Sequence, residues 1–436
     1  MITQQKSMLN RKVAPVIKDA IEFELILPPY KKHVLSNGVE VYAIDLGTVD
    51  AMMINWIFDA GNSYEKKNGV AGAVSALLKN GTSTRKAFDI NEHFEYYGAY
   101  LNRSAQHETA EITLHCLNKY VHELLPVVAE LVTDSIYPQE ELDIYKKNAQ
   151  QCLQVSLKKS DFVASRLIDS YLYGFEHPYG KYSVMEDYQE LKREDLLEFY
   201  KSFYQNGACR IIAAGRLPED LISQLEASFG KLPLHAPPSN GIAAAAASIV
   251  PATQKKYEIT NDPNGVQGSI RIARNFPNRH HPDFQRVQVL NNVFGGYFGS
   301  RLMANIREEK GYTYGIYSYL VNNLQESAIV ISTEAGKEVC AATIEEVYKE
   351  MNEIREDLID EEELQMARNF AIGTVLGDLD GPFHVAGRWK NIILNGLGMD
   401  YFEKGIEIVK TITPEELQEL AKKYLDPADF FELVVV

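Results

Sequence analysis

An arginine and a tyrosine seven residues apart are the side chains best suited to chemistry in this chain. Arg307 lies in a segment where Leu302 and Ile306 follow a helical spacing, and Gly311 predicts the end of that helix. Tyr314 follows in an expected strand, so the two side chains could face one cleft. A guanidinium binds peptide oxygens through a fork of donors, and a phenol can donate to a developing oxyanion. The spacing therefore predicts a pair that polarises a carbonyl.

The same residues also allow an interpretation without chemistry. Arg307 could form a surface ion pair with Glu308 or Glu309, and Tyr314 could be half-buried packing. Composition alone favours this plainer interpretation, because most charges on a helix are simply solvated.

Turn signals surround this segment. Gly295 and Gly296 predict a tight backbone turn, and Ser300 predicts the N-cap of the helix that follows. Upstream, a helix is predicted over residues 284–294. The Arg307 helix is therefore expected between a glycine turn and a strand.

The chain repeats its pattern of elements at an offset of about 220 residues, which is typical of a duplicated domain. Residues 137–142 and 359–364 each start a long helix, and residues 191–214 and 412–435 each hold a helix followed by an apolar strand. Alternating strands are also predicted over residues 38–44, 53–58 and 269–273. Each half thus predicts an α+β unit, in which helices cover an antiparallel sheet.

The length of 436 residues predicts two domains of roughly 200 residues each. Between the halves, residues 237–241 read Pro-Pro-Ser-Asn-Gly and residues 243–247 are all alanine, a composition typical of an exposed linker. The expected divisions are an N-terminal extension (1–22), an N-domain (23–232), a linker (233–255) and a C-domain (256–436).

Composition excludes several classes of function. The net charge of −16 argues against nucleic-acid binding, which requires clustered basic residues. No apolar run approaches the roughly 20 residues that cross a bilayer, and the N-terminus has no secretory h-region. The four cysteines form no C-x-x-C pair, so reduced thiols are expected. A cytoplasmic protein without a membrane or nucleic-acid partner is predicted.

The motif around Arg307 resembles that of a known family. A glycine turn is followed by S-R-L at residues 300–302, by I-R-E at residues 306–308, and by a tyrosine seven residues after the arginine. The same motifs occur in the same order in the insulinase/pitrilysin family of zinc peptidases. From about residue 28 to the C-terminus, the chain resembles this family, in particular its small bacterial two-domain members. The resemblance implies that Arg307 and Tyr314 form the family's substrate-binding Arg/Tyr pair, and that the chain is half of a clamshell.

The family's N-domain motif, G-x-A-H-x-x-E-H-x-x-x-x-G-T, is present here without its metal ligands. The matching frame residues are Gly69, Ala71, Gly81 and Thr82. The His, Glu and His positions of the motif hold Gly72, Ser75 and Ala76. None of these three can ligate zinc or accept a proton from water. The third ligand, a glutamate about 75 residues further on, is missing too, since residues 144–160 contain no acidic residue. This domain is therefore expected to bind no metal.

Retention of the Arg/Tyr motif without zinc ligands predicts a division of labour. By the resemblance, this chain is the non-zinc-binding subunit of a heterodimeric metallopeptidase, and a homologous partner chain holds the zinc and completes the site around a peptide substrate. No cofactor is expected in this chain. One alternative is a catalytically inert scaffold or peptide-binding protein. A homodimeric zinc peptidase would require unexpected ligands.

Several other polar motifs imitate functional sites. Residues 107–111 nearly spell H-E-x-x-H, but Glu111 replaces the second histidine, and the alternation that follows is that of a strand. His107, Glu111 and His115 are expected on a solvated strand face. His280 and His281 are expected in a loop, residues 378–381 lack calcium-loop spacing, and residues 175–180 predict a structural turn.

Overall fold

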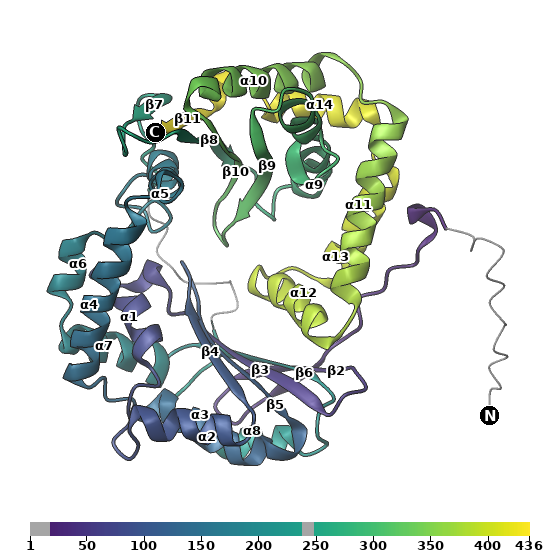
Figure 1. Cartoon of the computed structure of the whole chain (residues 1–436). Helices are drawn as coiled ribbons and strands as arrows, with labels where there is room; N and C mark the ends of the chain where they lie inside the picture. Colours follow the sequence, from purple (N-terminus) through teal and green to yellow (C-terminus); the bar gives the residue numbers. More distant parts are fainter. Residues whose placement is uncertain (1–17, 238–247) are drawn as a thin grey trace, which may run out of the picture.

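The computed structural model describes residues 18–237 and 248–436. The predictions for residues 1–17 of the N-terminal extension and 238–247 of the linker lie outside the described residues. We call the parts before and after 238–247 the N-terminal and C-terminal halves. Figure 1 shows one sheet in each half, at opposite ends of the molecule, with helices on its outer side.

The N-terminal half contains a six-stranded sheet in the order β1-β2-β6-β3-β5-β4. Its strands are β1 (Lys31–Val34), β2 (Glu40–Asp45), β3 (Ala51–Phe58), β4 (Tyr100–Ala105), β5 (Ala110–Leu117) and β6 (Cys209–Gly215). The strands predicted over residues 38–44 and 53–58 are confirmed as β2 and β3. All neighbours are antiparallel except β2 and β6, which run parallel, so the sheet is mixed rather than purely antiparallel.

The C-terminal half contains a five-stranded sheet in the order β7-β11-β8-β10-β9. Its strands are β7 (Lys256–Ile259), β8 (Gln267–Phe276), β9 (Thr313–Asn322), β10 (Ser327–Gly336) and β11 (Phe431–Val435). Again one pair, β7 and β11, is parallel and the others are antiparallel. Strands β4 and β9 are edge strands of their sheets, and β9 carries Tyr314.

Helices cover both sheets, as the α+β prediction requires. In the N-terminal half they are α1 (Val70–Leu77), α2 (Ala87–Tyr96), α3 (Val121–Asp134), α4 (Gln139–Ser156), α5 (Ser160–Tyr173), α6 (Met185–Glu190), α7 (Arg193–Tyr200) and α8 (Leu221–Phe229). In the C-terminal half they are α9 (Phe284–Asn291), α10 (Cys340–Glu356), α11 (Glu361–Leu379), α12 (Pro382–Leu394), α13 (Met399–Thr411) and α14 (Pro414–Tyr424). The repeated long helices are α4 and α11, and the repeated helix–strand units are α7–β6 and α14–β11.

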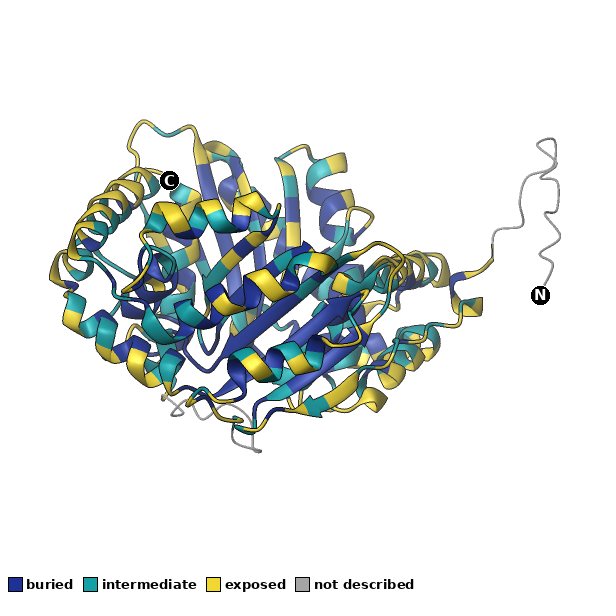
Figure 2. Ribbon diagram, turned by 90° about the horizontal axis from the view of Figure 1, so that it is seen from below, coloured by how far each residue is buried: buried dark blue, intermediate teal, exposed yellow. Residues whose placement is uncertain are grey.

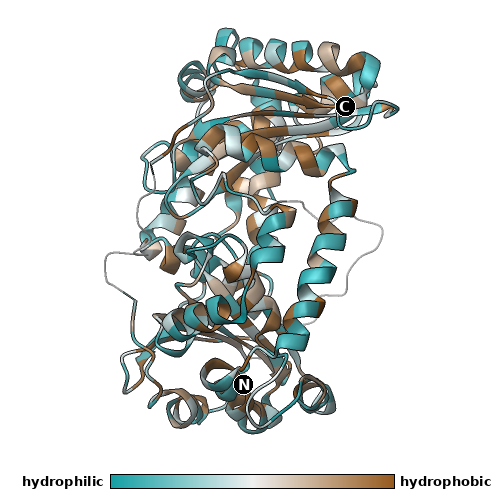
Figure 3. Ribbon diagram, turned by 90° about the vertical axis from the view of Figure 1, so that its left-hand side faces the viewer, coloured by the Kyte–Doolittle hydropathy of each residue, from teal (hydrophilic) through white to brown (hydrophobic). Residues whose placement is uncertain are grey.

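Local sequence explains where the repeated helices begin. The Asp360 carboxylate accepts a hydrogen bond from the Glu363 amide at the start of α11. At the start of α14, Thr413 and Glu416 form a reciprocal capping box, and Pro414 occupies the first turn. Helix α14 buries Leu417, Leu420, Ala421 and Tyr424. Figure 3 shows hydrophobic residues interspersed with hydrophilic ones along the helices of the molecule.

One helix of each half also packs against the sheet of the other half. Side chains of α5, including Ile168 and Leu172, pack against Phe431 and Leu433 of β11 in the C-terminal sheet. Conversely, α12 lies across the N-terminal sheet, where Trp389 joins a buried cluster with residues of β2, β3 and β6. Strand β6 is consequently buried along its whole length, as Figure 2 shows for the central strands of the sheets. The two predicted repeats are therefore not separate units in space, because each packs one helix against the sheet of the other.

The start of the described chain ties the halves together further. The Gln365 side chain of α11 donates to Asp19, Lys410 of α13 donates to the Phe23 carbonyl, and the Trp389 indole donates to the Pro28 carbonyl at 2.7 Å. Within the described residues, no helix is long and apolar enough to cross a membrane.

Candidate functional site

The glycine turn before the Arg307 segment is shaped by a neighbouring strand. Helix α9 continues as a π-helical stretch, Asn292–Gly296, and ends where Tyr297 adopts an extended conformation. A Cβ on Gly295 would lie 2.7 Å from Cβ of Ser318 and 2.9 Å from its backbone nitrogen. Strand β9 therefore passes too close for any side chain, which explains the glycine.

The helical segment that follows is largely a π-helix. After two α-helical residues, Arg301 and Leu302, residues Met303–Glu309 form a π-helix. Leu302, Met303 and Ile306 are fully buried, which confirms the predicted apolar stripe. Gly311 follows with a φ of +66°, so the predicted end of the helix is also confirmed. Ser300 stands directly before the first helical residue, as predicted, and its carbonyl accepts from the Ala304 amide at 2.9 Å. The side-chain cap is not formed, because the buried Ser300 hydroxyl has no hydrogen-bond partner among the described residues.

Two polar anchors fix the orientation of this segment. Arg301 binds the Glu363 carboxylate of α11 through two hydrogen bonds of 2.7 and 2.8 Å. The Asn305 amide donates to Glu346 and Glu350 of α10 at 2.8 and 2.7 Å. Sequence reasoning missed both anchors, because their partners lie more than 40 residues away along the chain.

The Arg307 guanidinium is held between two aromatic rings. Its central carbon lies 4.6 Å from the ring centre of Phe298 and 5.6 Å from that of Tyr314. Among the described residues Arg307 makes no ion pair, and the neighbouring Glu309 pairs with Lys310 instead. Tyr314 is 93% exposed. Neither the predicted alternative of a surface ion pair nor that of half-buried packing describes this geometry. The structure thus brings Arg307 and Tyr314 together, as the sequence predicted.

A β-bulge directs Tyr314 away from the sheet. Thr313 pairs with Ala335 and Ile316 with Thr333, so β9 has one residue more than β10 across this interval. The hydroxyls of Thr313 and Thr333 hydrogen-bond each other at 2.8 Å and close the bulge. The exposed phenol of Tyr314 is therefore a consequence of sheet geometry.

The emptied motif is helix α1 in the N-terminal half. Gly72 is exposed on its surface, Ser75 is buried and Ala76 is half-buried. A Cβ on Gly72 would meet only the Tyr145 hydroxyl of α4, at 3.9 Å. Burial raises the pKa of that hydroxyl to about 12. The residues at these positions do not fit a zinc ion, and no cluster of three or more His, Cys, Asp or Glu with metal-binding geometry occurs in the described part of the chain.

The retained frame residues of the motif have structural roles. Gly69, with a φ of +86°, starts α1, and the Glu65 carboxylate accepts from the amides of Gly69 and Ala71. After α1, the Thr82 hydroxyl donates to Glu130 of α3. The frame is therefore explained by helix capping and loop anchoring, which persist without a metal.

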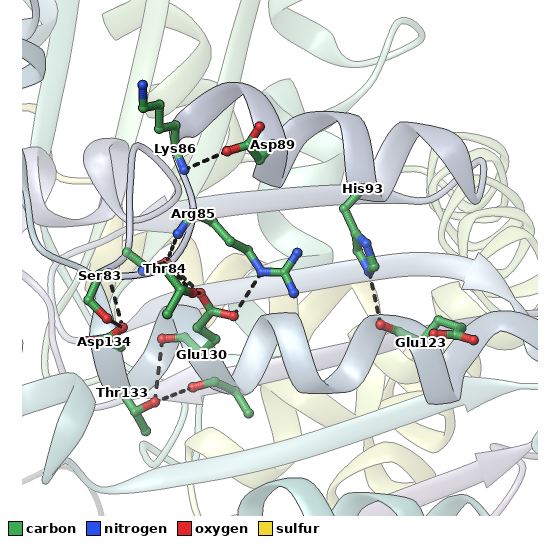
Figure 4. A network of polar contacts seen from close by, with 12 residues as sticks. Ser83, Thr84, Arg85, Lys86, Asp89, His93, Glu123, Glu130, Thr133 and Asp134 are labelled. Carbon is green, nitrogen blue, oxygen red and sulfur yellow. Dashed lines mark hydrogen bonds and ion pairs between the residues drawn. The ribbon is translucent and has the colours of Figure 1, made fainter.

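Thr84 and Arg85 also bind Glu130, as Figure 4 shows. Burial alone would raise the pKa of Glu130, but hydrogen bonds from Thr82, Thr84 and Arg85 hold it below its usual value. The carboxylate is thus kept charged for its loop contacts.

Residues 107–111, which nearly spell H-E-x-x-H, lie where the two halves contact each other. Its strand, β5, is confirmed, but His107 and Glu108 lie in the turn before it. The Tyr179 hydroxyl, in the predicted turn at residues 175–180, donates to the buried Glu108 and accepts from the Gln325 amide of the C-terminal half at 3.2 Å. Burial raises the pKa of Glu108.

The expected solvated strand face does not exist. Lys390 of α12 binds both Glu111 oxygens at 3.0 and 2.9 Å, and the Phe383 ring packs edge-on against His115. The prediction failed because the covering helix comes from the other half of the chain.

The fold and the two motifs define a two-half, peptidase-like protein in which Gly72, Ser75 and Ala76 stand at the metal-ligand positions of helix α1. Residues 46–177 match the insulinase family, peptidase family M16, and residues 190–370 match the peptidase M16 inactive domain. The chain belongs to this family.

Three known proteins are similar to this chain in sequence. The chain is 23% identical to the uncharacterized zinc protease YmxG of Bacillus subtilis, over 80% of this chain and 84% of that protein. It is 24% identical to the non-peptidase homolog YmxG of Helicobacter pylori, over 88% of both chains. The probable mitochondrial-processing peptidase subunit beta of Schizosaccharomyces pombe is 25% identical, over 62% of this chain and 60% of that protein.

A solved structure shares the fold. The peptidase M16 inactive domain from Pseudomonas fluorescens superposes with a TM-score of 0.82 and 22% identity, covering 93% of this chain and 98% of that one. The predicted two-domain α+β fold is thereby confirmed, and the predicted family is confirmed by the two family models.

Proposed function

We propose that this chain is the non-zinc-binding subunit of a two-chain metallopeptidase and contributes Arg307 and Tyr314 to the binding and polarisation of a peptide substrate. A homologous partner chain would hold the zinc ion, which supplies the activated water for hydrolysis. The main support is the geometry at Arg307, which is fixed by its neighbours and yet lacks a carboxylate partner in the described chain.

The two side chains have complementary tasks in this proposal. The guanidinium donates hydrogen bonds to peptide carbonyl oxygens, and the aromatic rings orient it without neutralising its charge. The Tyr314 hydroxyl, exposed on an edge strand, donates to the oxygen on which negative charge develops. A peptide bond is the substrate class that both donors fit.

The test is peptide cleavage by this chain mixed with a homologous chain that has an intact H-x-x-E-H helix. Neither Arg307→Ala nor Tyr314→Phe should prevent association of the two chains on gel filtration. Each should lower kcat/KM by about tenfold or more, because each removes a transition-state donor. Tyr317→Phe, on the same strand, is the matched control and should leave turnover unchanged.

A second candidate function is a scaffold or peptide-binding protein without a catalytic role. The Helicobacter relative described as a non-peptidase homolog supports it. Under this alternative the mixture would form a complex, but both variants would cleave peptides as fast as the wild type.

We also propose a cytoplasmic location for the chain, which is supported by four cysteines that form no disulfide.

A further inference from the structure

A second site of possible function lies in the C-terminal half, away from both motifs. An open cavity of about 740 Å³ lies between α9, α11, α12 and α13. It meets a shallower depression of about 570 Å³ along a shared border formed by Arg279, Gln285 and Tyr401. The assigned Arg/Tyr pair is not part of its lining.

Two guanidiniums approach the Tyr401 hydroxyl at this border. The hydroxyl is buried and makes no well-aligned hydrogen bond in the described chain, although the Arg279 and Gln285 side chains lie next to it. Burial raises its pKa overall, but Arg279 and Arg388 both lie close enough to oppose that effect. Arg279, Arg388 and Tyr401 all line this cavity, so their charges and hydroxyl would stabilise an anion bound on this side of it.

The positive charge at this position is only partly compensated. Arg388 binds Asp378 through one nitrogen, at 2.5 Å, while its buried Nε has no partner among the described residues. Arg279 lies over the Phe284 ring and has no ion pair within the described residues. The third cation of the lining, Lys390, is already paired with Glu111. In a chain of net charge −16, a cavity with one unpaired guanidinium, Arg279, and one that is only partly occupied, Arg388, favours an anionic guest.

The rest of the cavity indicates what the anion is attached to. Apolar side chains cover much of its wall, among them Val289, Phe370, Val375 and Phe402. A bare phosphate ion would leave this wall in contact with water, whereas a carboxylate on an apolar residue would cover it. Phe370 also stacks on Tyr297 of the glycine turn, with ring centres 4.7 Å apart, so the cavity adjoins the segment that carries Arg307.

We propose that this cavity binds the free carboxyl terminus of a peptide, with Arg279, Arg388 and Tyr401 around the carboxylate and the apolar wall around the last side chain. This is a binding property of the single chain, and it does not require the peptidase role or a partner chain.

Calorimetric titration of the full chain with three probes tests the chemistry. The probes are acetyl-Ala-Ala-Leu with a free carboxylate, the same peptide as its amide, and inorganic phosphate. We expect saturable binding of the acid, and binding of the amide that is about tenfold weaker or more, because charge-assisted hydrogen bonds are lost.

Two variants test the location of the site by independent means. Arg279→Gln removes an unpaired guanidinium, and Lys147→Gln, an exposed cation on α4, is its matched control. Gly387→Leu fills the cavity from α12 without removing a charge, since a Cβ there meets nothing within 4 Å. Gly373→Leu is its control, because Gly373 is equally open but lies outside the cavity.

Arg279→Gln and Gly387→Leu should each weaken binding of the acid by about tenfold, and the two controls should bind like the wild type. Equal affinity for acid and amide would overturn carboxylate recognition. Binding of phosphate without the peptide would overturn the peptide assignment, and binding that survives both variants would overturn the location. Absence of binding by all three probes would overturn the proposal as a whole.

Discussion

At the scale of single residues, the Arg307 guanidinium is held in position by aromatic rings rather than by a carboxylate that would neutralise its charge. Contact with the Phe298 and Tyr314 rings restricts the guanidinium, while no described residue occupies its N–H groups. An ion pair with Glu308 or Glu309 would have restricted it equally but would have occupied those donors. The difference between the two interpretations of the sequence is therefore a difference in available hydrogen bonds.

Asp169 of α5 is a residue whose charge should limit stability. Burial raises the pKa of its carboxyl to about 7, although Arg271 opposes this. Between its usual value of 3.8 and about 7, the folded state holds a proton that the unfolded state has lost, so stability falls as pH rises through this range. Asp169→Asn should therefore raise Tm by about 2 °C or more at pH 8 and change it little at pH 4.

Thermal unfolding followed by circular dichroism at both pH values checks this prediction. Glu176→Gln, which changes an exposed carboxylate nearby in sequence, is the control and should leave Tm unchanged at both pH values. A stabilisation by Asp169→Asn that is equal at pH 4 and pH 8 would contradict the assigned charge effect.

At the scale of elements, the Arg307 segment is positioned by its contacts with three other elements. Strand β9 presses against Gly295, α11 holds Arg301 and α10 holds Asn305. A π-helical stretch over Met303–Glu309 is tolerated because these contacts compensate for its weaker local geometry.

Gly295→Ala should destabilise the fold by about 1–3 kcal/mol, because the new Cβ would clash with the backbone of β9. Gly373→Ala provides the comparison within a helix, where the open surroundings allow a gain of about 0.5–1 kcal/mol. Urea titration of both variants gives the free energies of unfolding. A neutral Gly295→Ala would mean that β9 can move away, and that the close approach does not fix the turn.

At the scale of the whole molecule, the exchange of α5 and α12 makes the halves mutually dependent. Each exchanged helix buries apolar side chains on the sheet of the other half, and burial of one large side chain contributes about 1.5–3 kcal/mol. Without its counterpart, each half would expose this surface to water.

A split of the chain tests this dependence. Fragments 1–237 and 248–436, expressed together, should copurify through a tag on one of them. Each fragment alone should be insoluble or should bind a hydrophobic dye, because the surface buried by the exchanged helices is uncovered. A single half that is soluble and unfolds cooperatively would show instead that the exchanged helices are dispensable.

The sequence by itself determined the features that depend on local pattern. Alternation predicted β2, β3 and β8, the repeated helix–strand units predicted the duplication, and residue types at Gly72, Ser75 and Ala76 predicted a helix without metal ligands. These features follow from which side chains can face a core or bind a metal, and neighbours in the chain are enough to reveal them.

Only the tertiary structure decided which surfaces meet. It placed α12 over Glu111 and His115, joined Glu108 and Tyr179 to the opposite half, and set Arg279, Arg388 and Tyr401 in the wall of one cavity. Hydrophobic periodicity shows that one side of a helix or strand is buried, but it does not show what covers that side, because burial is favourable against any complementary apolar surface. The partners were therefore set by packing between segments that lie far apart in the chain.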